Sequence, residues 1–253
     1  MFDLTGRRAL VTGAGQGVGV GIARALLRQG ASVAVNDVVP GRADVTVRGL
    51  TAAVEGARAV AAPFDVTSAD AVHAGVAGAT DALGGPIDIL VNNAGIPPGM
   101  APVPFSDMDP AAWRQYVDLN LYGSLHCIRA VLAGMRERGW GRIVQISSGA
   151  GRTGLPIGVS LYGASKSAVE GFVRHLAAEV ARDGVTANVV ALGLMEPRED
   201  ADRNVTEGLA RSVPVGRLGT PDDVGAAVVY LASDEASWIT GQTIDLNGGS
   251  TMH

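Results

Sequence analysis

Short runs of apolar, largely β-branched residues recur along the chain, and longer stretches with helical patterning separate them. The short runs do not alternate between apolar and polar residues, which is typical of parallel strands buried on both faces. The strands are expected at Ala9–Val11, Ser32–Asn36, Ala59–Phe64, Ile87–Val91, Ile143–Ile146, Val185–Val190 and Thr243–Leu246.

The helices are expected to lie between these strands. Asp109-Pro110 and Thr220-Pro221 each place a capping side chain before a proline at the first helical position, a strong signal for a helix start. Further helices are predicted from the glycine-rich turn to Gln29, from Ser68 to Leu83, and around Tyr162. The first capped helix is expected to run towards Arg138.

Strands and helices that alternate in this way, joined by right-handed crossovers, predict a doubly wound α/β fold. We expect a mostly parallel seven-stranded sheet with helices on both faces, of the Rossmann type. No linker or internal repeat divides residues 1–253, so a single domain is predicted. Residues 193–204 lack apolar periodicity, and a mobile substrate loop or lid is predicted around residues 193–212.

Composition narrows the class of protein. The 253 residues are 47% hydrophobic and carry a net charge of −5, which argues against a nucleic-acid or anionic-membrane partner. The single cysteine, Cys127, excludes an internal disulfide and a cysteine metal cluster, and no metal site is expected. The chain shows neither an apolar signal region nor a membrane-length apolar run, so a cytoplasmic protein is predicted.

A glycine-rich turn follows the first predicted strand and opens a helix. Its glycines, Gly13, Gly17 and Gly19, follow a G-x-x-x-G-x-G spacing. Such a turn lets a pyrophosphate approach backbone N–H groups at the positive end of a helix. A purely structural turn is the alternative, but the position between strand and helix favours nucleotide binding.

An acidic residue, Asp37, ends the second predicted strand. A carboxylate there can accept hydrogen bonds from an adenosine ribose and would repel a 2′-phosphate. No arginine or lysine flanks it, and Arg42 is the nearest. The sequence therefore predicts NAD rather than NADP as cofactor. Asp65, after the third strand, is expected at the adenine edge, or else as a turn residue.

Tyr162 and Lys166 lie at positions i and i+4 of a predicted helix, so their side chains share one face. A phenol with an ordinary pKa of about 10 is a poor acid or base at neutral pH, and a nearby cation lowers that pKa. This spacing is common by chance, and an unremarkable surface pair is the alternative. The remaining motifs decide between the two.

With these features the chain resembles the short-chain dehydrogenase/reductase family over its whole length. The motifs that carry the resemblance occur in the expected order, on strand ends or helices. They are Thr12-Gly13-x-x-x-Gly17-x-Gly19, Asp65-Val66, Asn92-Asn93-Ala94-Gly95, Asn120, Ser148, Tyr162-x-x-x-Lys166 and Ile239-Thr240-Gly241-Gln242.

The resemblance implies a role for each motif residue. Tyr162 would be the general acid/base, Lys166 would bind the nicotinamide ribose and lower the Tyr162 pKa, and Ser148 would hydrogen-bond the substrate oxygen. Asn120 would support a water chain from Lys166 to solvent. The cofactor-binding residues would be Gly13, Gln16, Gly17, Val18, Gly19, Asp37, Val38, Asp65, Val66, Asn93, Ala94, Gly95, Tyr162, Lys166, Gly193 and Met195.

Three positions depart from the family pattern. Ser148 precedes Tyr162 by 14 residues where many relatives have 13, and Ser147 and Ser160 are nearby alternatives. Leu192-Gly193 replaces a common Pro-Gly. Pro197 stands where a threonine commonly binds the cofactor carboxamide, so backbone groups near Met195 are expected to replace it.

The expected pocket rim is mostly apolar, with Leu155, Ile157 and Leu194 among its residues. An NAD(H)-dependent oxidoreductase acting on an apolar cyclic, steroid-like or acyl secondary alcohol or ketone is therefore predicted. A 3-oxoacyl thioester reductase is one alternative. An NAD-binding regulatory protein with weak catalysis is an alternative of another class. The resemblance also implies a homotetramer.

Overall fold

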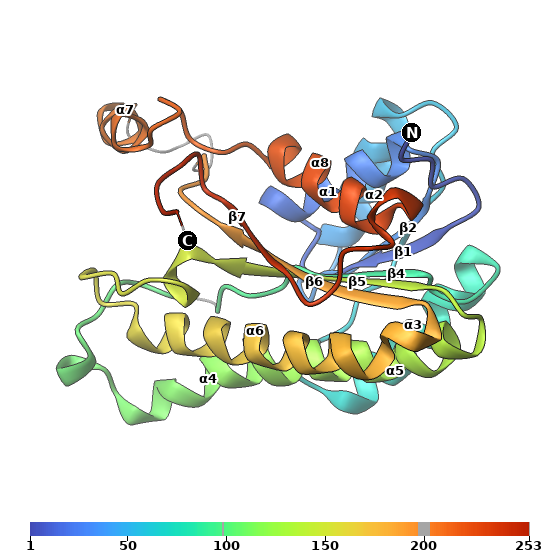
Figure 1. The fold of residues 1–253 in the computed structure, drawn as a ribbon, viewed down its shortest axis with the longest axis horizontal. Helices are drawn as coiled ribbons and strands as arrows, with labels where there is room; N and C mark the ends of the chain where they lie inside the picture. Colours follow the sequence, from blue (N-terminus) through green and yellow to red (C-terminus); the bar gives the residue numbers. More distant parts are fainter. Residues whose placement is uncertain (98, 197–202, 253) are drawn as a thin grey trace.

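The computed structural model describes residues 1–97, 99–196 and 203–252, with a central seven-stranded sheet (Figure 1). The strand order is β3-β2-β1-β4-β5-β6-β7, and every pairing is parallel. The strands are β1 (Arg8–Val11), β2 (Ser32–Val35), β3 (Ala59–Ala61), β4 (Ile89–Asn92), β5 (Gly141–Ser148), β6 (Val185–Leu192) and β7 (Thr243–Leu246).

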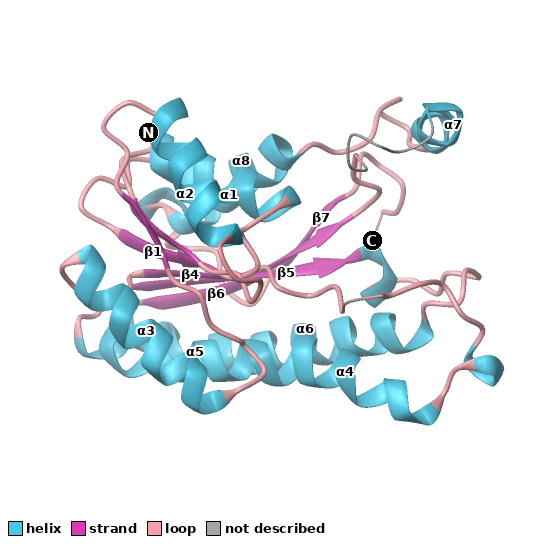
Figure 2. Ribbon diagram, turned by 180° about the vertical axis from the view of Figure 1, so that it is seen from behind, coloured by secondary structure: helices cyan, strands magenta, loops and turns pink. Residues whose placement is uncertain are grey.

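Helices cover both faces of the sheet, as Figures 1 and 2 show. One face carries α1 (Gly17–Arg28), α2 (Arg42–Ala53) and α8 (Pro221–Ala232). The opposite face carries α3 (Ala69–Leu83), α4 (Trp113–Val117), α5 (Gly123–Glu137) and α6 (Ser160–Val180). Helix α7 (Arg203–Ser212) lies apart from both layers, beyond the carboxyl end of β7.

Successive side chains of each strand enter different cores, because a β-strand alternates its side chains between the two faces. In β4, Ile89 and Val91 pack with α1 and α8, whereas Leu90 packs with α3 and α5. Both sets are apolar, which is why the strands read as unbroken hydrophobic runs. The predicted Rossmann-type fold is confirmed.

The element boundaries differ from the predictions in several places. β5 and β6 are longer than predicted, and β3 ends at Ala61 rather than Phe64. The predicted helix from Asp109 to Arg138 is divided by a π-helical turn, Asp118–Tyr122. Helices α2 and α7 were not predicted.

The two helices were missed for different reasons. α2 contains β-branched residues and a glycine, and it buries only Ala43, Thr46 and Leu50. α7 begins inside the stretch predicted to be irregular. The sequence of α2 has no clear apolar stripe, whereas that of α7 is amphipathic but only ten residues long and mostly polar. Among the described residues, no helix is long and apolar enough to cross a membrane.

Candidate active site

Helix α6 places Tyr162 and Lys166 at the carboxyl edge of the sheet. Lys166 is buried, and its Nζ donates a 3.0 Å hydrogen bond to the carbonyl oxygen of Ile146 in β5. The same Nζ lies 5.7 Å from the centre of the Tyr162 ring. The predicted pair therefore faces the sheet and does not lie on an exposed helix surface.

Burial changes the acidity of both side chains. It raises the pKa of the Tyr162 phenol above its usual value, and a hydrogen bond with the Ser148 side chain opposes this effect. Burial also lowers the pKa of Lys166 to about 8, and the charge of Glu170 opposes that change. The expectation that Lys166 lowers the Tyr162 pKa remains a prediction, since burial is the larger influence here.

Ser148 is the last residue of β5 and contacts Tyr162 through that hydrogen bond. Its Oγ also accepts a 3.2 Å hydrogen bond from the Ala150 amide, which fixes the start of the following turn. Ser147 faces the opposite side of the strand and bonds to Glu170, and Ser160 is exposed. Of the three serines considered, Ser148 is therefore the one that the structure brings to the phenol.

Asn120 lies in the π-helical turn between α4 and α5 and is fully buried. Its Nδ2 donates to Ser165 Oγ at 3.1 Å, and its Oδ1 has no hydrogen-bond partner among the described residues. A Cβ added at Gly95 would collide with Lys166 Nζ and lie 2.8 Å from Asn120 Oδ1. Gly95, Asn120 and Lys166 therefore converge around a buried acceptor that has no partner among the described residues.

The glycine turn connects β1 to the N-terminus of α1. Gly13 and Gly17 have positive φ angles of 60° and 56°, which favour glycine. Gln16 provides no side-chain cap, and the first turn of α1 contains no acidic residue. The helix therefore presents its N-terminal amide groups and its positive end to an anion.

The loop after β4 supports this turn. Asn93 Nδ2 donates to the carbonyl oxygens of Thr12 and Gly13, at 2.9 and 3.0 Å. A Cβ at Gly19 would lie 2.8 Å from Asn93 Nδ2, and a Cβ at Gly13 would lie 2.9 Å from Ala94 Cα. Asn93, Ala94 and the glycines therefore form one close-packed unit, with Val18 partly buried beside it.

Asp37 follows β2 and is buried across the turn from Gly15. Its Oδ1 accepts a 2.9 Å hydrogen bond from the Val39 amide. Arg42, at the start of α2, places Nη1 3.4 Å from the same oxygen. The sequence did not indicate this ion pair, because α2 was missed and Arg42 is five residues away.

The other predicted adenosine contacts are less enclosed. Asp65 is exposed, and its Oδ1 accepts hydrogen bonds from the amide and the hydroxyl of Thr67, as in a turn. Val66 is buried and packs over Gly123. Val38 is exposed. Both alternatives for Asp65, adenine contact and turn residue, are compatible with this position.

The segment after β6 contacts the end of β7 at its first residue, Gly193. Gly193 donates its amide to Leu246 O at 3.0 Å, and a Cβ there would lie 2.7 Å from Asn247 Cα. Met195 pairs with Gly219 as an isolated parallel bridge. Pro197, the position of the missing threonine, lies outside the described residues, and the predicted lid remains a prediction.

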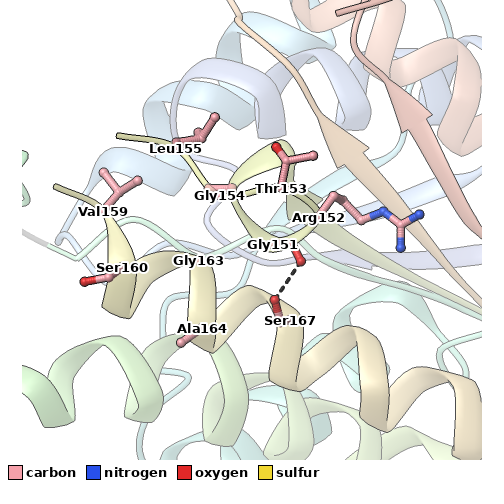
Figure 3. Close-up of a pocket in the computed structure, with 11 residues that line it drawn as sticks. Gly151, Arg152, Thr153, Gly154, Leu155, Val159, Ser160, Gly163, Ala164 and Ser167 are labelled. Carbon is pink, nitrogen blue, oxygen red and sulfur yellow. Dashed lines mark hydrogen bonds between the residues drawn. The ribbon is translucent and has the colours of Figure 1, made fainter. Parts of the chain in front are cut away.

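A cavity of about 370 Å³ lies between the loop after β5 and the first turns of α6 (Figure 3). Its α6 residues, Ser160, Gly163, Ala164 and Ser167, are offset from Tyr162 and Lys166 around the helix. The cavity therefore adjoins the candidate site but does not contain its catalytic side chains. The lining consists of Ala150, Gly151, Arg152, Thr153, Gly154, Leu155, Val159, Ser160, Gly163, Ala164 and Ser167.

No group of three or more potential metal ligands occurs among the described residues. Cys127 is a buried core residue, and burial raises the pKa of its thiol to about 12. The described residues therefore contain no cluster that could hold a metal ion, and the Cys127 thiol is not a reactive nucleophile.

Comparisons with known proteins identify relatives of the whole chain. A family model described as enoyl-(acyl carrier protein) reductase matches residues 13–251. An acetoacetyl-CoA reductase from Shinella zoogloeoides is 39% identical, over 96% of this chain and 98% of the relative.

Two solved structures are also similar to the chain. A 3-oxoacyl-[acyl-carrier protein] reductase from Brucella melitensis with bound NAD has a TM-score of 0.88 and 37% identity, and the match covers 100% of this chain and 94% of that one. A gluconate 5-dehydrogenase from Burkholderia cenocepacia J2315, in complex with NADP and tartrate, has a TM-score of 0.88 and 34% identity, over 98% and 96%.

The fold and the site thus define a Rossmann-type oxidoreductase acting on CH–OH groups. Within that class, the chain belongs to the short-chain dehydrogenase/reductase family. Such enzymes use nicotinamide cofactors.

Proposed function

We propose that the protein is an NAD(H)-dependent oxidoreductase that interconverts a secondary alcohol and a ketone. The observation that supports this most strongly is the convergence of Tyr162, Ser148 and Lys166 at one edge of the sheet. There Ser148 hydrogen-bonds the phenol, and a buried ammonium group lies 5.7 Å from its ring.

The residues present fit a nicotinamide dinucleotide. The uncapped N-terminus of α1, with Gly13, Gly17 and Gly19, suits a pyrophosphate. Asp37 suits the adenosine ribose, and Lys166 suits the nicotinamide ribose. When bound, the cofactor supplies hydride transfer.

Each active-site side chain then has a defined task. Tyr162 donates a proton to the ketone oxygen during reduction and accepts one from the alcohol during oxidation. Ser148 orients that oxygen by a hydrogen bond. Lys166 favours the phenolate through its positive charge. Asn120, with its unpartnered Oδ1, holds a water that returns protons towards solvent.

The cofactor preference follows from Asp37. Its carboxylate would hydrogen-bond a ribose diol and repel a 2′-phosphate. Arg42 partly offsets that repulsion because it pairs with the same carboxylate. The two similar structures contain NAD in one case and NADP in the other, so we propose NAD on the basis of Asp37 alone.

The substrate proposed is apolar, whether cyclic, steroid-like or acyl. Four large apolar side chains are exposed on the segments that follow β4, β5 and β6, and this supports the proposal. They are Ile96, Leu155, Ile157 and Leu194. Initial rates across cyclic, steroidal, acyl and polyol alcohols test the idea, and a clear preference for polyols would overturn it.

A 3-oxoacyl thioester reductase is the second candidate. The acetoacetyl-CoA reductase and the 3-oxoacyl-[acyl-carrier protein] reductase among the similar proteins support it. Because that second protein was solved with NAD, Asp37 does not count against a thioester substrate. Reduction of acetoacetyl-CoA at a rate well above that of simple ketones would favour this candidate.

The central experiment replaces Tyr162 with phenylalanine. Tyr162→Phe should lower kcat by about 100-fold or more, since general acid–base catalysis contributes at least that much, while NAD binding stays close to normal. Tyr230→Phe, on the distant helix α8, is the matched control. Full activity of Tyr162→Phe would exclude the mechanism. A normally folded wild-type protein that binds NAD without turning over any alcohol would favour the regulatory alternative.

We also propose a homotetramer. Trp238 is 97% exposed in the single chain, and an exposed tryptophan of this kind is typical of a subunit interface. Light scattering at micromolar concentration should give the mass of four chains, and a monomer would contradict this.

A further inference from the structure

Four ionic side chains of alternating charge lead from Lys166 to β7, and the first two act on each other through their charges without a direct ion pair. Glu170 is one turn further along α6. Arg152, from the loop after β5, places Nη1 3.6 Å from Glu170 Oε2 and Nε 3.5 Å from Asp245 Oδ1 of β7. The order is therefore cation, anion, cation, anion, drawn from the helix, a loop and a strand.

Glu170 is held rigidly within this row. Its side chain is only 3% exposed, and Ser147 Oγ donates a 2.5 Å hydrogen bond to Oε1. A Cβ added at Gly151 would lie 2.9 Å from Glu170 Oε1 and 3.0 Å from Lys166 Cβ. The carboxylate and the lysine stem are therefore pressed against the same short turn, with no space for water between that turn and either group.

Lys166 has neutral surroundings in the other directions. Ile146 contributes a carbonyl oxygen, Asn120 an amide and Gly95 only backbone. The titratable groups that face it are Tyr162 and Glu170 on its own helix, while Arg152 and Asp245 act through Glu170. A buried ammonium without a counter-charge is unfavourable, and Glu170 is the carboxylate positioned to supply one.

Arg152 lines the neighbouring cavity, but its guanidinium points to the carboxylates of this row. Figure 3 shows its guanidinium extending away from Leu155 and Val159, the apolar side of the lining. It lies 3.6 Å from Glu170 and 3.5 Å from Asp245, although its Nε makes no hydrogen bond among the described residues, and the four charges of the row sum to zero. Removal of the Glu170 charge would therefore make the potential at Lys166 more positive, and removal of the Arg152 charge would make it more negative.

We propose that Glu170 is a positioning residue that keeps Lys166 protonated in its buried site, and that Arg152 limits the strength of this effect. The inference rests on the proposed roles of Lys166 and Tyr162. It attributes the positive charge of Lys166 to Glu170, a residue that belongs to none of the family motifs. It also connects the active-site lysine to the loop after β5 and to β7.

The sequence offers an unusually direct test, because Lys166 is its only lysine. Protein grown with lysine carrying ¹³C at Cε gives a single side-chain lysine resonance, so its titration needs no assignment. In the wild type this resonance should titrate near the pKa of about 8 that burial produces. The measurement uses free enzyme and does not depend on turnover.

Three variants test the direction in which each charge moves the titration midpoint of Lys166. Glu170→Gln should lower the titration midpoint of Lys166 by about one pH unit, the size expected for the loss of one partly screened charge nearby. Arg152→Met should raise the midpoint, because it removes a cation beside Glu170. Glu179→Gln, an exposed change on the same helix, is the control and should leave the midpoint unchanged.

The alkaline limb of kcat/KM for ketone reduction should move in the same direction as each midpoint. An unchanged midpoint in both Glu170→Gln and Arg152→Met would overturn the inference. Because Arg152 is partly exposed, its variant decides the question even if Glu170→Gln does not fold. Midpoints that move without any effect on the rate profile would instead count against the proposed role of Lys166.

Discussion

Replacement of Asp37 by alanine should weaken the proposed preference for NAD and shift the enzyme towards NADP. Asp37 is buried beside the glycine turn, where its Oδ1 accepts hydrogen bonds from the Val39 amide and from Arg42 Nη1. A Cβ added at Gly15 would contact the Asp37 carboxylate and would lie 2.7 Å from Arg42 Cγ. Both side chains therefore border the place proposed for the adenosine ribose.

The size of the change follows from two contributions. Loss of a charged hydrogen-bond acceptor for the ribose costs about 1.5–3 kcal/mol, which lowers kcat/KM with NAD by roughly 10- to 100-fold. Arg42, freed from the carboxylate, can pair with a 2′-phosphate. We assign this charge-assisted contact about 1.4 kcal/mol, or roughly tenfold in favour of NADP. The preference should therefore shift by about 10² to 10³.

The assay is the ratio of kcat/KM with NAD⁺ to that with NADP⁺ for one alcohol. Asp37→Ala combined with Arg42→Met should lose the gain with NADP⁺ while keeping the loss with NAD⁺. Asp44→Ala, an exposed acidic position in the first turn of α2, is the matched control. An unchanged ratio in Asp37→Ala would refute the role of Asp37, and an unaltered gain in the double variant would refute that of Arg42.

Three further predictions concern the lysine site and the fold. Gly95→Ala forces Lys166 Nζ from its place and should reduce kcat about 100-fold, because a misplacement of about 1 Å can have an effect of that size. The control is Gly78→Ala on α3, where an added Cβ meets no atom within 4 Å and kcat should not change. Equal activities of the two variants would contradict the close packing at Gly95. Since Lys166 loses its proton as the pH rises through about 8, ketone reduction should decline above that pH, and a flat profile to pH 10 would disprove the assignment. Thr220→Ala removes the hydroxyl that accepts a 3.2 Å hydrogen bond from the Asp223 amide. The loss of this cap should destabilise the protein by about 1 kcal/mol and lower Tm by roughly 2–4 °C, whereas the exposed control Thr51→Ala should leave Tm unchanged. A Tm equal to that of the wild type would show that the cap contributes nothing.

The local sequence was sufficient for the fold class and for most of the candidate site. Apolar runs separated by capped helical stretches predict a doubly wound sheet, because each strand must bury both faces. In such a sheet the carboxyl ends of the strands share one edge, so motifs placed after successive strands must converge. Strand order and helical spacing therefore predict that Ser148, Tyr162 and Lys166 lie near one another, and the structure brings them together.

Other features depended on contacts between distant residues. The ion pair of Asp37 with Arg42 needs the turn into α2, a helix whose β-branched residues and glycine hide its periodicity. The sequence favoured Ser148 over Ser147, and the facing helix shows why Ser147 is occupied elsewhere, since Ser147 hydrogen-bonds Glu170.

The sequence by itself determined which residue types stand at the ends of which elements, because secondary structure and strand order follow from local patterns. The tertiary structure decided which charges are buried and what opposes them. The burial of Lys166 and the joining of Glu170, Arg152 and Asp245 depend on packing between α6, the loop after β5 and β7. Desolvation and charge pairing arise only when those segments meet, so no local pattern could have revealed them.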